Sequence, residues 1–252
     1  MKTNNFTARL MQMLRDNAQA ERKPLNVVRN DAAKEATIYI YDVIDSYWGV
    51  NDQDIAREVA GLPKDTWIKA RVNSPGGDVF TGRAIATTFA NHPGKVTAYV
   101  DGLAASAATT VCDSADEIVM AKGSFYMIHN SWTVAAGNKS AFMDTAALLA
   151  KIDGEIAADY VQRTGKTVEE IVQLMDAETW FTAQEAFDNG FATSVAEKVA
   201  KAENSAKRWN LAAFTNVPKA LLEMPDPAPE NEWAAMHAAN ARRLQLFSLS
   251  TA

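Results

Sequence analysis

The sequence predicts a mixed α/β fold, because strand-like and helix-like segments alternate from Ala36 onward. Short runs of β-branched and aromatic residues are typical of buried strands, and the segments between them carry apolar residues at helical spacing with cap residues at their ends. A hydrophobic share of 48% in 252 residues is sufficient for one substantial core with appended termini. Periodicity alone defines no more than this class.

Each element is predicted by its own local pattern. Strands are expected where β-branched and aromatic residues cluster, at Ile38–Ile44, Trp67–Val72, Lys95–Val100, Glu117–Met120, Phe125–Ile128 and Phe191–Val195. Longer helices are expected at Asn51–Gly61, Val79–Ala90, Ala105–Cys112 and about Ser140–Arg163. Two further short helices begin at Thr167 and Thr182, because each threonine is followed three residues later by a glutamate that completes a capping box.

The two ends of the chain depart from this pattern. Residues 1–34 form a polar N-terminal arm with a short apolar stripe at helical spacing, which favours a short amphipathic helix that is mobile or packs between subunits. Residues 198–252 form a tail interrupted by prolines, with one expected helix at Trp233–Phe247. Residues 35–197 are then the folded domain, and the tail is expected to be partly helical or processed.

Composition argues against several classes of protein. The net charge is -6, and the lysines and arginines form no stripe, so no nucleic-acid partner is expected. The single cysteine, Cys112, cannot form an intrachain disulfide, which suits a reducing compartment. No apolar run reaches the roughly 20 residues that span a bilayer, and the N-terminus lacks the apolar core of a signal peptide. We expect a cytoplasmic protein with no membrane contact, metal or cofactor.

The segment Asp101-Gly-Leu-Ala-Ala-Ser-Ala-Ala-Thr-Thr110 places one serine, Ser106, among very small residues. A serine that opens a helix directly after a strand can expose its Oγ to a substrate, while the N–H groups of the helix start can stabilise a developing oxyanion. Ser106 is therefore a candidate nucleophile. The alternative is a small-residue helix that packs closely against a neighbour.

Two other segments contain the groups that such a nucleophile requires. Ser74-Pro-Gly-Gly77 follows an expected strand, and the absence of a Cβ lets a substrate oxygen approach the N–H groups of Gly76 and Gly77. His129 ends an apolar strand, whereas the other two histidines lie in a turn and in the polar tail. A partly desolvated imidazole suits proton transfer near neutral pH, so His129 is the candidate general base.

Four motifs, in their order and spacing, resemble the ClpP family of serine peptidases, especially the shorter phage and prophage members described as ClpP-related head maturation proteases. They are Ser74-Pro-Gly-Gly77, Gly102-Leu-Ala-Ala-Ser106, Met127-Ile-His129 and Trp180-Phe-Thr-Ala-Gln-Glu-Ala-Phe-Asp-Asn-Gly190, within a resemblance from about Ile38 to about Ser194. The resemblance implies a ClpP/crotonase-like spiral of ββα units with a projecting handle helix, as a peptidase domain over residues 35–197. It assigns Ser106 as nucleophile and His129 as base, with Gly76, Gly77 and the N–H of Ala107 forming the oxyanion hole.

The sequence departs from the family at the third member of the triad. The family has an aspartate two residues before the phenylalanine that corresponds to Phe181, where this chain has Thr179. We favour Asp176 as a replacement, because a short carboxylate at a helix end is easily fixed in position. Glu178 and the Thr179 hydroxyl are alternatives, as is a Ser-His dyad with a weaker helper. The choice matters because the orienting group holds the histidine in its useful tautomer.

The loop after His129 contains Trp132 and Val134, which we expect to line the substrate groove, because residues at this place do so in the family. The alternative for Trp132 is a surface contact between subunits. A peptide substrate is expected to bind as an added strand along this edge and the Gly76-Gly77 edge, with its main chain supplying most of the affinity.

The predicted function is that of an ATP-independent serine endopeptidase that processes phage capsid or scaffold proteins in head maturation, in the cytoplasm of a bacterial host or within the prohead. The resemblance implies homo-oligomeric rings, and no segment indicates an ATPase partner. Three alternatives stay open: a non-catalytic ring-forming assembly module of the same fold, a crotonase-type acyl-CoA enzyme, and a Ser-Lys peptidase that uses Lys122 or Lys139.

Overall fold

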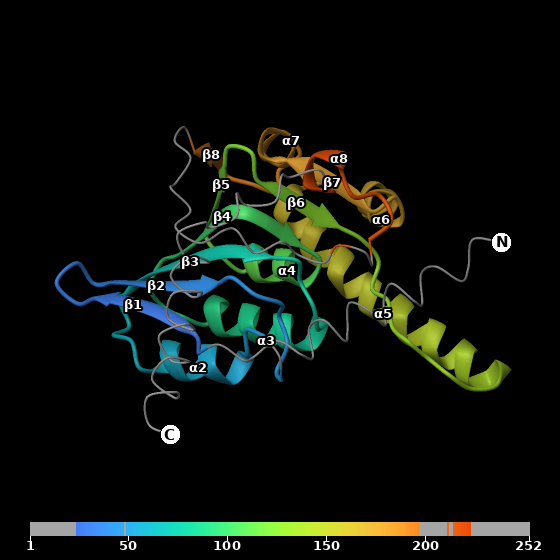
Figure 1. Ribbon diagram of the computed structural model, residues 1–252, viewed down its shortest axis with the longest axis horizontal. Helices are drawn as coiled ribbons and strands as arrows, with labels where there is room; N and C mark the ends of the chain where they lie inside the picture. The colour runs from blue at the N-terminus through green and yellow to red at the C-terminus, as the bar shows by residue number, and fades with distance from the viewer. Residues whose placement is uncertain (1–23, 48, 197–210, 212–213, 223–252) are drawn as a thin grey trace, which may run out of the picture. The chain divides into compact units, whose positions relative to one another are not determined.

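The alternating pattern folds into an eight-stranded sheet in the computed structural model, which describes residues 24–47, 49–196, 211 and 214–222 (Figure 1). The main path of the sheet is β1-β2-β3-β4-β5-β8, while β6 pairs with β4 and with β7. The strands are β1 (Asn26–Asn30), β2 (Glu35–Ile40), β3 (Trp67–Ser74), β4 (Val96–Ala105), β5 (Glu117–Ala121), β6 (Phe125–Ile128), β7 (Thr179–Thr182) and β8 (Ser194–Ala196). All pairs are parallel except β1 with β2 and β6 with β7. The mixed α/β class is confirmed.

Six helices of the same unit accompany this sheet in the described part of the chain. They are α2 (Asp52–Ala60), α3 (Val79–Ala90), α4 (Ala107–Asp113), α5 (Lys139–Thr164), α6 (Val168–Asp176) and α7 (Ala183–Asp188). Figure 1 shows α2, α3 and α4 side by side along β2, β3 and β4, and α2 contacts α3, which contacts α4. The chain forms one unit up to Asn216, and the second unit, from Val217, is described as far as residue 222 and contains α8 (Lys219–Leu222).

The core lies between the sheet and these helices. Along β2 and β3, partly exposed and buried side chains alternate, so that residues such as Ile38, Ile68 and Val72 face inward with no exposed surface. Ile55 of α2 and Ile85 of α3 are equally buried and belong to the same cluster. Burial of one such side chain contributes about 1.5–3 kcal/mol, so this apolar layer is the main source of stability.

Strand β4 is longer than the sequence pattern predicts. Its first half, Thr97–Val100, pairs with β5, and its second half, Leu103–Ala105, pairs with β6. The residues Gly102–Ala105 therefore continue the strand, and α4 begins at Ala107, not at Ala105 as predicted. A Cβ at Gly102 would lie 2.9 Å from Asn73 Oδ1, which explains the glycine at this point. The extended strand leads directly to Ser106.

Helix α5 is the projecting helix that the sequence predicts. Asn138 caps its start by accepting a hydrogen bond from the N–H of Ala141, and Gly165, with φ of 72°, ends it in a left-handed conformation. Its C-terminal half buries Ile156 and Tyr160, whereas its N-terminal half is largely exposed and extends away from the sheet in Figure 1. None of the helices described is both long enough and apolar enough to cross a membrane.

The ends of the domain differ from the predicted boundaries. Strand β1 lies inside the range 1–34 that was predicted to be an arm, and its nearly all-exposed residues explain why no apolar pattern marks it. Strand β7 was not predicted, and the expected strand Phe191–Val195 is reduced to β8. Both capping boxes are confirmed, at Thr167 and at Thr182. The helix expected near the N-terminus and the one expected at Trp233–Phe247 lie outside the described residues.

Replacement of Asn51 tests the contribution of the α2 cap to stability. Its side chain accepts hydrogen bonds from the N–H groups of Gln53 and Asp54, and its Nδ2 donates to the carbonyl of Ser46. We expect Asn51→Ala to lower the free energy of unfolding by about 2 kcal/mol in urea titrations followed by circular dichroism. Asn51→Ser keeps the cap acceptor and should lose less; equal losses would assign the effect to the Ser46 contact.

Candidate active site

Ser106 occupies a strained turn between β4 and α4. Its φ of 54° and ψ of −129° are rare for a residue with a side chain, and such a conformation costs about 1–3 kcal/mol. Hydrogen bonds on both sides hold it: its N–H donates to the carbonyl of Met127 at 2.9 Å, and its own carbonyl accepts from the N–H of Thr109 at 2.8 Å. The turn leaves the Oγ at the end of the strand, open to a neighbouring base.

His129 is that neighbour. Its Nε2 lies 2.8 Å from the Oγ of Ser106, within the distance needed for proton transfer. The contact follows from the sheet, because Ala105 pairs with Met127, so that the residues that follow β4 and β6 meet at the same edge. The two side chains predicted separately as nucleophile and base are thus brought together.

The surroundings of His129 favour the neutral imidazole. Burial lowers the pKa of His129 from its ordinary 6.5, and the negative charges of Glu178 and Asp153 act in the opposite direction. A neutral imidazole whose Nε2 is unprotonated can accept the proton of the serine hydroxyl. The net direction of the shift keeps the base in this form at neutral pH.

Two backbone N–H groups beside this pair have no hydrogen-bond partner among the residues that the structure describes and can face an oxyanion. Ile44 donates to the carbonyl of Gly76 and accepts from the N–H of Asp78, so the N–H of Gly77 between them points away from Ile44. The N–H of Ala107 opens α4 and has no partner within the helix. The N–H of Gly76 instead donates to Ser74 Oγ at 3.1 Å, so the third predicted donor is already engaged.

The role of Gly76 is steric. Its φ is 87°, and a Cβ there would lie 2.4 Å from the carbonyl oxygen of Ala105, 2.7 Å from Ser106 Cβ and 2.9 Å from the nitrogen of Ala107. Only glycine permits this close approach of the two loops. The approach brings the Gly76 loop against the start of α4 at Ala107.

The candidates for the third triad member have other partners. Asp176 is exposed and accepts a hydrogen bond from Asn130 Nδ2 at 2.7 Å. Glu178 accepts from the N–H groups of Thr215 and Asn216, and Thr179 donates its hydroxyl to the carbonyl of Leu174. Within the described part of the chain, none of the three hydrogen-bonds to His129.

Two groups near the base were missed in the sequence. The ring of Phe214 meets the imidazole of His129 edge-on, with centroids 5.5 Å apart, and also contacts Trp180. Asp153 of α5 accepts a hydrogen bond from the N–H of Ser131 and is the second carboxylate that acts on the pKa of His129. Phe214 belongs to a short apolar cluster with Leu211 inside the polar tail, which was an available signal; nothing in the α5 pattern distinguishes Asp153.

Ser106 and His129 open into a cavity of about 640 Å³. Trp132 and Val134, the two residues predicted for the substrate groove, line it. The remaining wall is largely apolar and comes mainly from the start of α3 and from α5, with Phe80, Leu148, Leu149 and Ile152. Among the described residues, the lining contains Asp45 and Asp78 but neither lysine nor arginine. Lys122 and Lys139, the residues of the Ser-Lys alternative, are thus absent from it.

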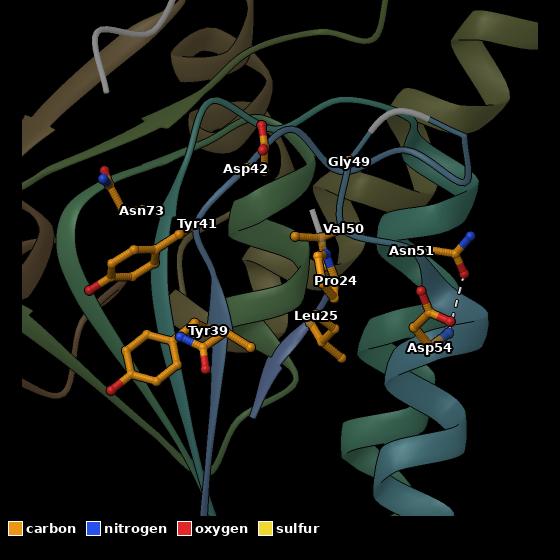
Figure 2. Close-up of a pocket in the computed structure, with 11 residues that line it drawn as sticks. Pro24, Leu25, Tyr39, Tyr41, Asp42, Gly49, Val50, Asn51, Asp54 and Asn73 are labelled. Carbon is orange, nitrogen blue, oxygen red and sulfur yellow. Dashed lines mark hydrogen bonds between the residues drawn. The ribbon is translucent and has the colours of Figure 1, made fainter. Parts of the chain in front are cut away.

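A second hollow, of about 510 Å³, lies beside β1 and β2, where it is lined by Tyr39 of β2 and by Tyr41, just after the end of that strand (Figure 2). Neither Ser106 nor His129 lines it. Among the residues that the structure describes, no group of three or more histidine, cysteine, aspartate or glutamate side chains is arranged to hold a metal ion.

The fold is that of the ClpP-type serine proteases, and comparison with known proteins agrees. Residues 22–199 match the Clp protease family, and the chain belongs to that family. The match covers the whole sheet from β1 to β8 and includes Ser106 and His129.

Similar proteins include Clp proteolytic subunits from several bacteria. The chain is 33% identical over 142 residues to the ATP-dependent Clp protease proteolytic subunit 2 of Rhodococcus jostii, covering 54% of this chain and 70% of that protein. It is 33% identical over 135 residues to subunit 1 of Corynebacterium jeikeium, covering 51% and 69%. A mutant ClpP1 from Listeria monocytogenes matches with a TM-score of 0.57 at 24% identity, over 64% of this chain and 91% of that chain, which confirms the fold. These matches give no support to a crotonase-type enzyme.

The steric role of Gly76 can be tested against a second glycine of the same conformation. Gly123 has φ of 90°, but a Cβ there would meet nothing within 4 Å. We expect Gly123→Ala to cost about 1 kcal/mol of unfolding free energy from backbone strain alone, and Gly76→Ala to cost about 3 kcal/mol or more with loss of Ser106 reactivity. Similar thermal unfolding and reactivity of the two variants would contradict the steric role.

The pH dependence of activity reports the pKa of His129. A general base acts only when neutral, so kcat/KM should fall on the acid side with a midpoint below 6.5, because burial lowers the pKa. Glu178→Gln removes a charge that raises this pKa and should move the midpoint to still lower pH. Glu170→Gln, in which glutamine preserves the capping box, is the control and should leave the midpoint unchanged. A midpoint that rises in Glu178→Gln would contradict the assignment.

Proposed function

We propose that this protein is a serine endopeptidase in which Ser106 is the nucleophile and His129 the general base. The observation that carries the proposal is the 2.8 Å contact between Ser106 Oγ and His129 Nε2 at a strained strand-to-helix turn. Membership of the Clp protease family supports it, because the two residues stand in the family's motifs. The apolar cavity beside the pair is large enough to receive a substrate side chain.

The mechanism follows from the positions of these groups. Ser106 Oγ attacks the carbonyl carbon of the scissile peptide while its proton moves to His129 Nε2. The N–H groups of Gly77 and Ala107 stabilise the oxyanion, and each such donor is worth roughly a hundred- to thousand-fold in rate. His129 then gives the proton to the leaving amine as the C–N bond breaks. A water molecule, deprotonated by His129, hydrolyses the acyl-enzyme in the same way and restores the serine.

The role of the third triad member belongs to groups that act on His129 without a direct hydrogen bond. Of the two carboxylates that raise the pKa of His129, Glu178 has the larger effect and Asp153 the smaller, and the ring of Phe214 meets the imidazole edge-on. We therefore favour Glu178 over Asp176, which is exposed and bonded to Asn130. In this arrangement the imidazolium is stabilised through space, and its orientation depends on packing.

The biological setting that we propose is the processing of phage capsid or scaffold proteins during head maturation. The support is the resemblance of the four sequence motifs to the shorter phage and prophage members of the family. The proposal includes a homo-oligomeric ring, action without an ATPase, and a location in the bacterial cytoplasm or the prohead. Incubation of the purified protein with capsid and scaffold proteins of the same phage, without ATP, followed by mass spectrometry of the products, tests the substrate class.

Covalent labelling tests the peptidase proposal most directly. A fluorophosphonate probe should label the wild type at Ser106, identified by peptide mass mapping, because the probe reacts only with an activated serine. Ser106→Ala should abolish labelling, and His129→Ala should slow it by at least about a hundredfold. Ser131→Ala, which changes another serine of the same cavity, is the control and should label normally. A folded wild type that is not labelled would instead favour the non-catalytic ring-forming module.

A further inference from the structure

The peptide bond between Ser106 and Ala107 contains one of the two proposed oxyanion donors. Because a peptide unit is planar and trans, its C=O and N–H point in opposite directions, and a group that fixes the carbonyl also fixes the direction of the N–H. The carbonyl of Ser106 accepts two hydrogen bonds from one residue of α4, from the N–H of Thr109 at 2.8 Å and from its Oγ1 at 2.6 Å. The orientation of the Ala107 N–H is therefore set at Thr109.

A second hydroxyl stands behind the first. The phenolic oxygen of Tyr160, in α5, lies 2.6 Å from Thr109 Oγ1. A threonine hydroxyl has one proton, and here that proton goes to the carbonyl of Ser106, so Tyr160 is the donor and Thr109 Oγ1 the acceptor. Burial raises the pKa of Tyr160, which keeps the phenol protonated. The result is a directed chain from Tyr160 through Thr109 to Ser106, in which each bond strengthens the next.

This chain of hydrogen bonds is buried inside the protein. Thr109 has no exposed surface, and Tyr160 is 2% exposed and packs edge-on against Phe191. In such surroundings a hydroxyl keeps one hydrogen-bonding arrangement, because no water competes for it. Tyr160 belongs to the buried half of α5, and the other half of this helix lines the substrate cavity. Helix α5 is therefore linked both to the cavity and, through Tyr160 and Thr109, to the Ser106–Ala107 peptide.

We propose that Thr109 and Tyr160 are positioning residues for acyl transfer, which hold the Ser106–Ala107 peptide so that the Ala107 N–H faces the oxyanion. The proposal rests on the proposed function of Ser106. It predicts that the two hydroxyls matter for the transition state and not for substrate binding, because neither touches the cavity. Thr110, the next residue of α4, is buried as well, but its hydroxyl has no hydrogen-bond partner among the described residues, which makes it the matched control.

The experiment compares Thr109→Val, Thr109→Ser, Tyr160→Phe and Thr110→Val in the full chain. Valine copies the shape of threonine without the hydroxyl, whereas serine keeps the hydroxyl and loses a methyl group. We expect Thr109→Val to lower kcat for a chromogenic ester and the rate of fluorophosphonate labelling by about tenfold or more with KM unchanged, since removal of a whole donor costs a hundred- to thousand-fold. Thr109→Ser should stay within about threefold of the wild type, and Thr110→Val should equal it.

Tyr160→Phe should give a smaller loss than Thr109→Val, and the double variant should be no slower than Thr109→Val alone, because the phenol acts only through Thr109. The acid-side midpoint of the pH profile should stay at the wild-type value in all variants, since His129 is not affected. Circular dichroism and thermal unfolding identify any variant that fails to fold. If Thr109→Val does not fold, the comparison of kcat and labelling rate between Thr109→Ser and Tyr160→Phe tests the proposal instead.

The order of the rates of Thr109→Ser and Thr109→Val distinguishes this proposal from a packing role. If Thr109 only fills space, Thr109→Ser leaves a void and is the slower variant, while Thr109→Val equals the wild type, and the proposal is wrong. A rise in KM at constant kcat, or equal losses in Thr109→Val and Thr110→Val, also overturns it. If the wild type reacts with neither ester nor probe, the peptidase proposal fails and this one fails with it, whereas a reactive wild type with unaffected variants removes this one alone.

Discussion

The pairing of the end of β4 with β6 is the constraint on which the site depends. Leu103–Ala105 lie beside Phe125–Met127 in parallel register, and the N–H of Ser106 continues this ladder by donating to the carbonyl of Met127. Each strand then leaves the sheet at the same edge, one into α4 and the other into the loop that starts at His129. A shift of one residue in this register would turn His129 to the opposite face of the sheet from Ser106. The backbone hydrogen bonds between β4 and β6 therefore set the relative position of Ser106 and His129.

The strain at Ser106 is maintained by contacts on every side of the turn. Gly76 lies so close to Ser106 and Ala107 that no other residue fits, and its loop is held in turn by the bridge between Ile44 and Gly77. Thr109 holds the carbonyl of Ser106 from the opposite side. A conformation with positive φ persists only when its surroundings determine it in this way. The hydrogen bonds that fix the strand, the loop and the helix therefore also fix where the serine and the two amides point.

Much of this arrangement could be predicted from the sequence, and the parts that could not have a common physical cause. Helix α3 and strand β6 match their predicted bounds, because cap residues and apolar alternation are local signals. The strand character of Gly102–Ala105 is not local: glycine and alanine have low strand propensity, and the pairing with β6 imposes the conformation. The groups around His129 are likewise placed by non-local contacts. The surroundings of His129 include a left-handed turn at Glu178, with φ of 47°, and Phe214, which lies far along the chain.

The segment at 214–216 belongs to the site in a physical sense, although its sequence lies in the predicted tail. The carboxylate of Glu178 is held by the N–H groups of Thr215 and Asn216, while Phe214 of the same segment packs against the imidazole. Asp153 is held in the same manner by the N–H of Ser131. Both carboxylates are therefore fixed before any charge forms on His129, and a charge held in place stabilises an imidazolium without the cost of reorganisation. We propose that a base supported in this way does not need a directly bonded aspartate, which is consistent with the threonine at position 179, where the family has an aspartate.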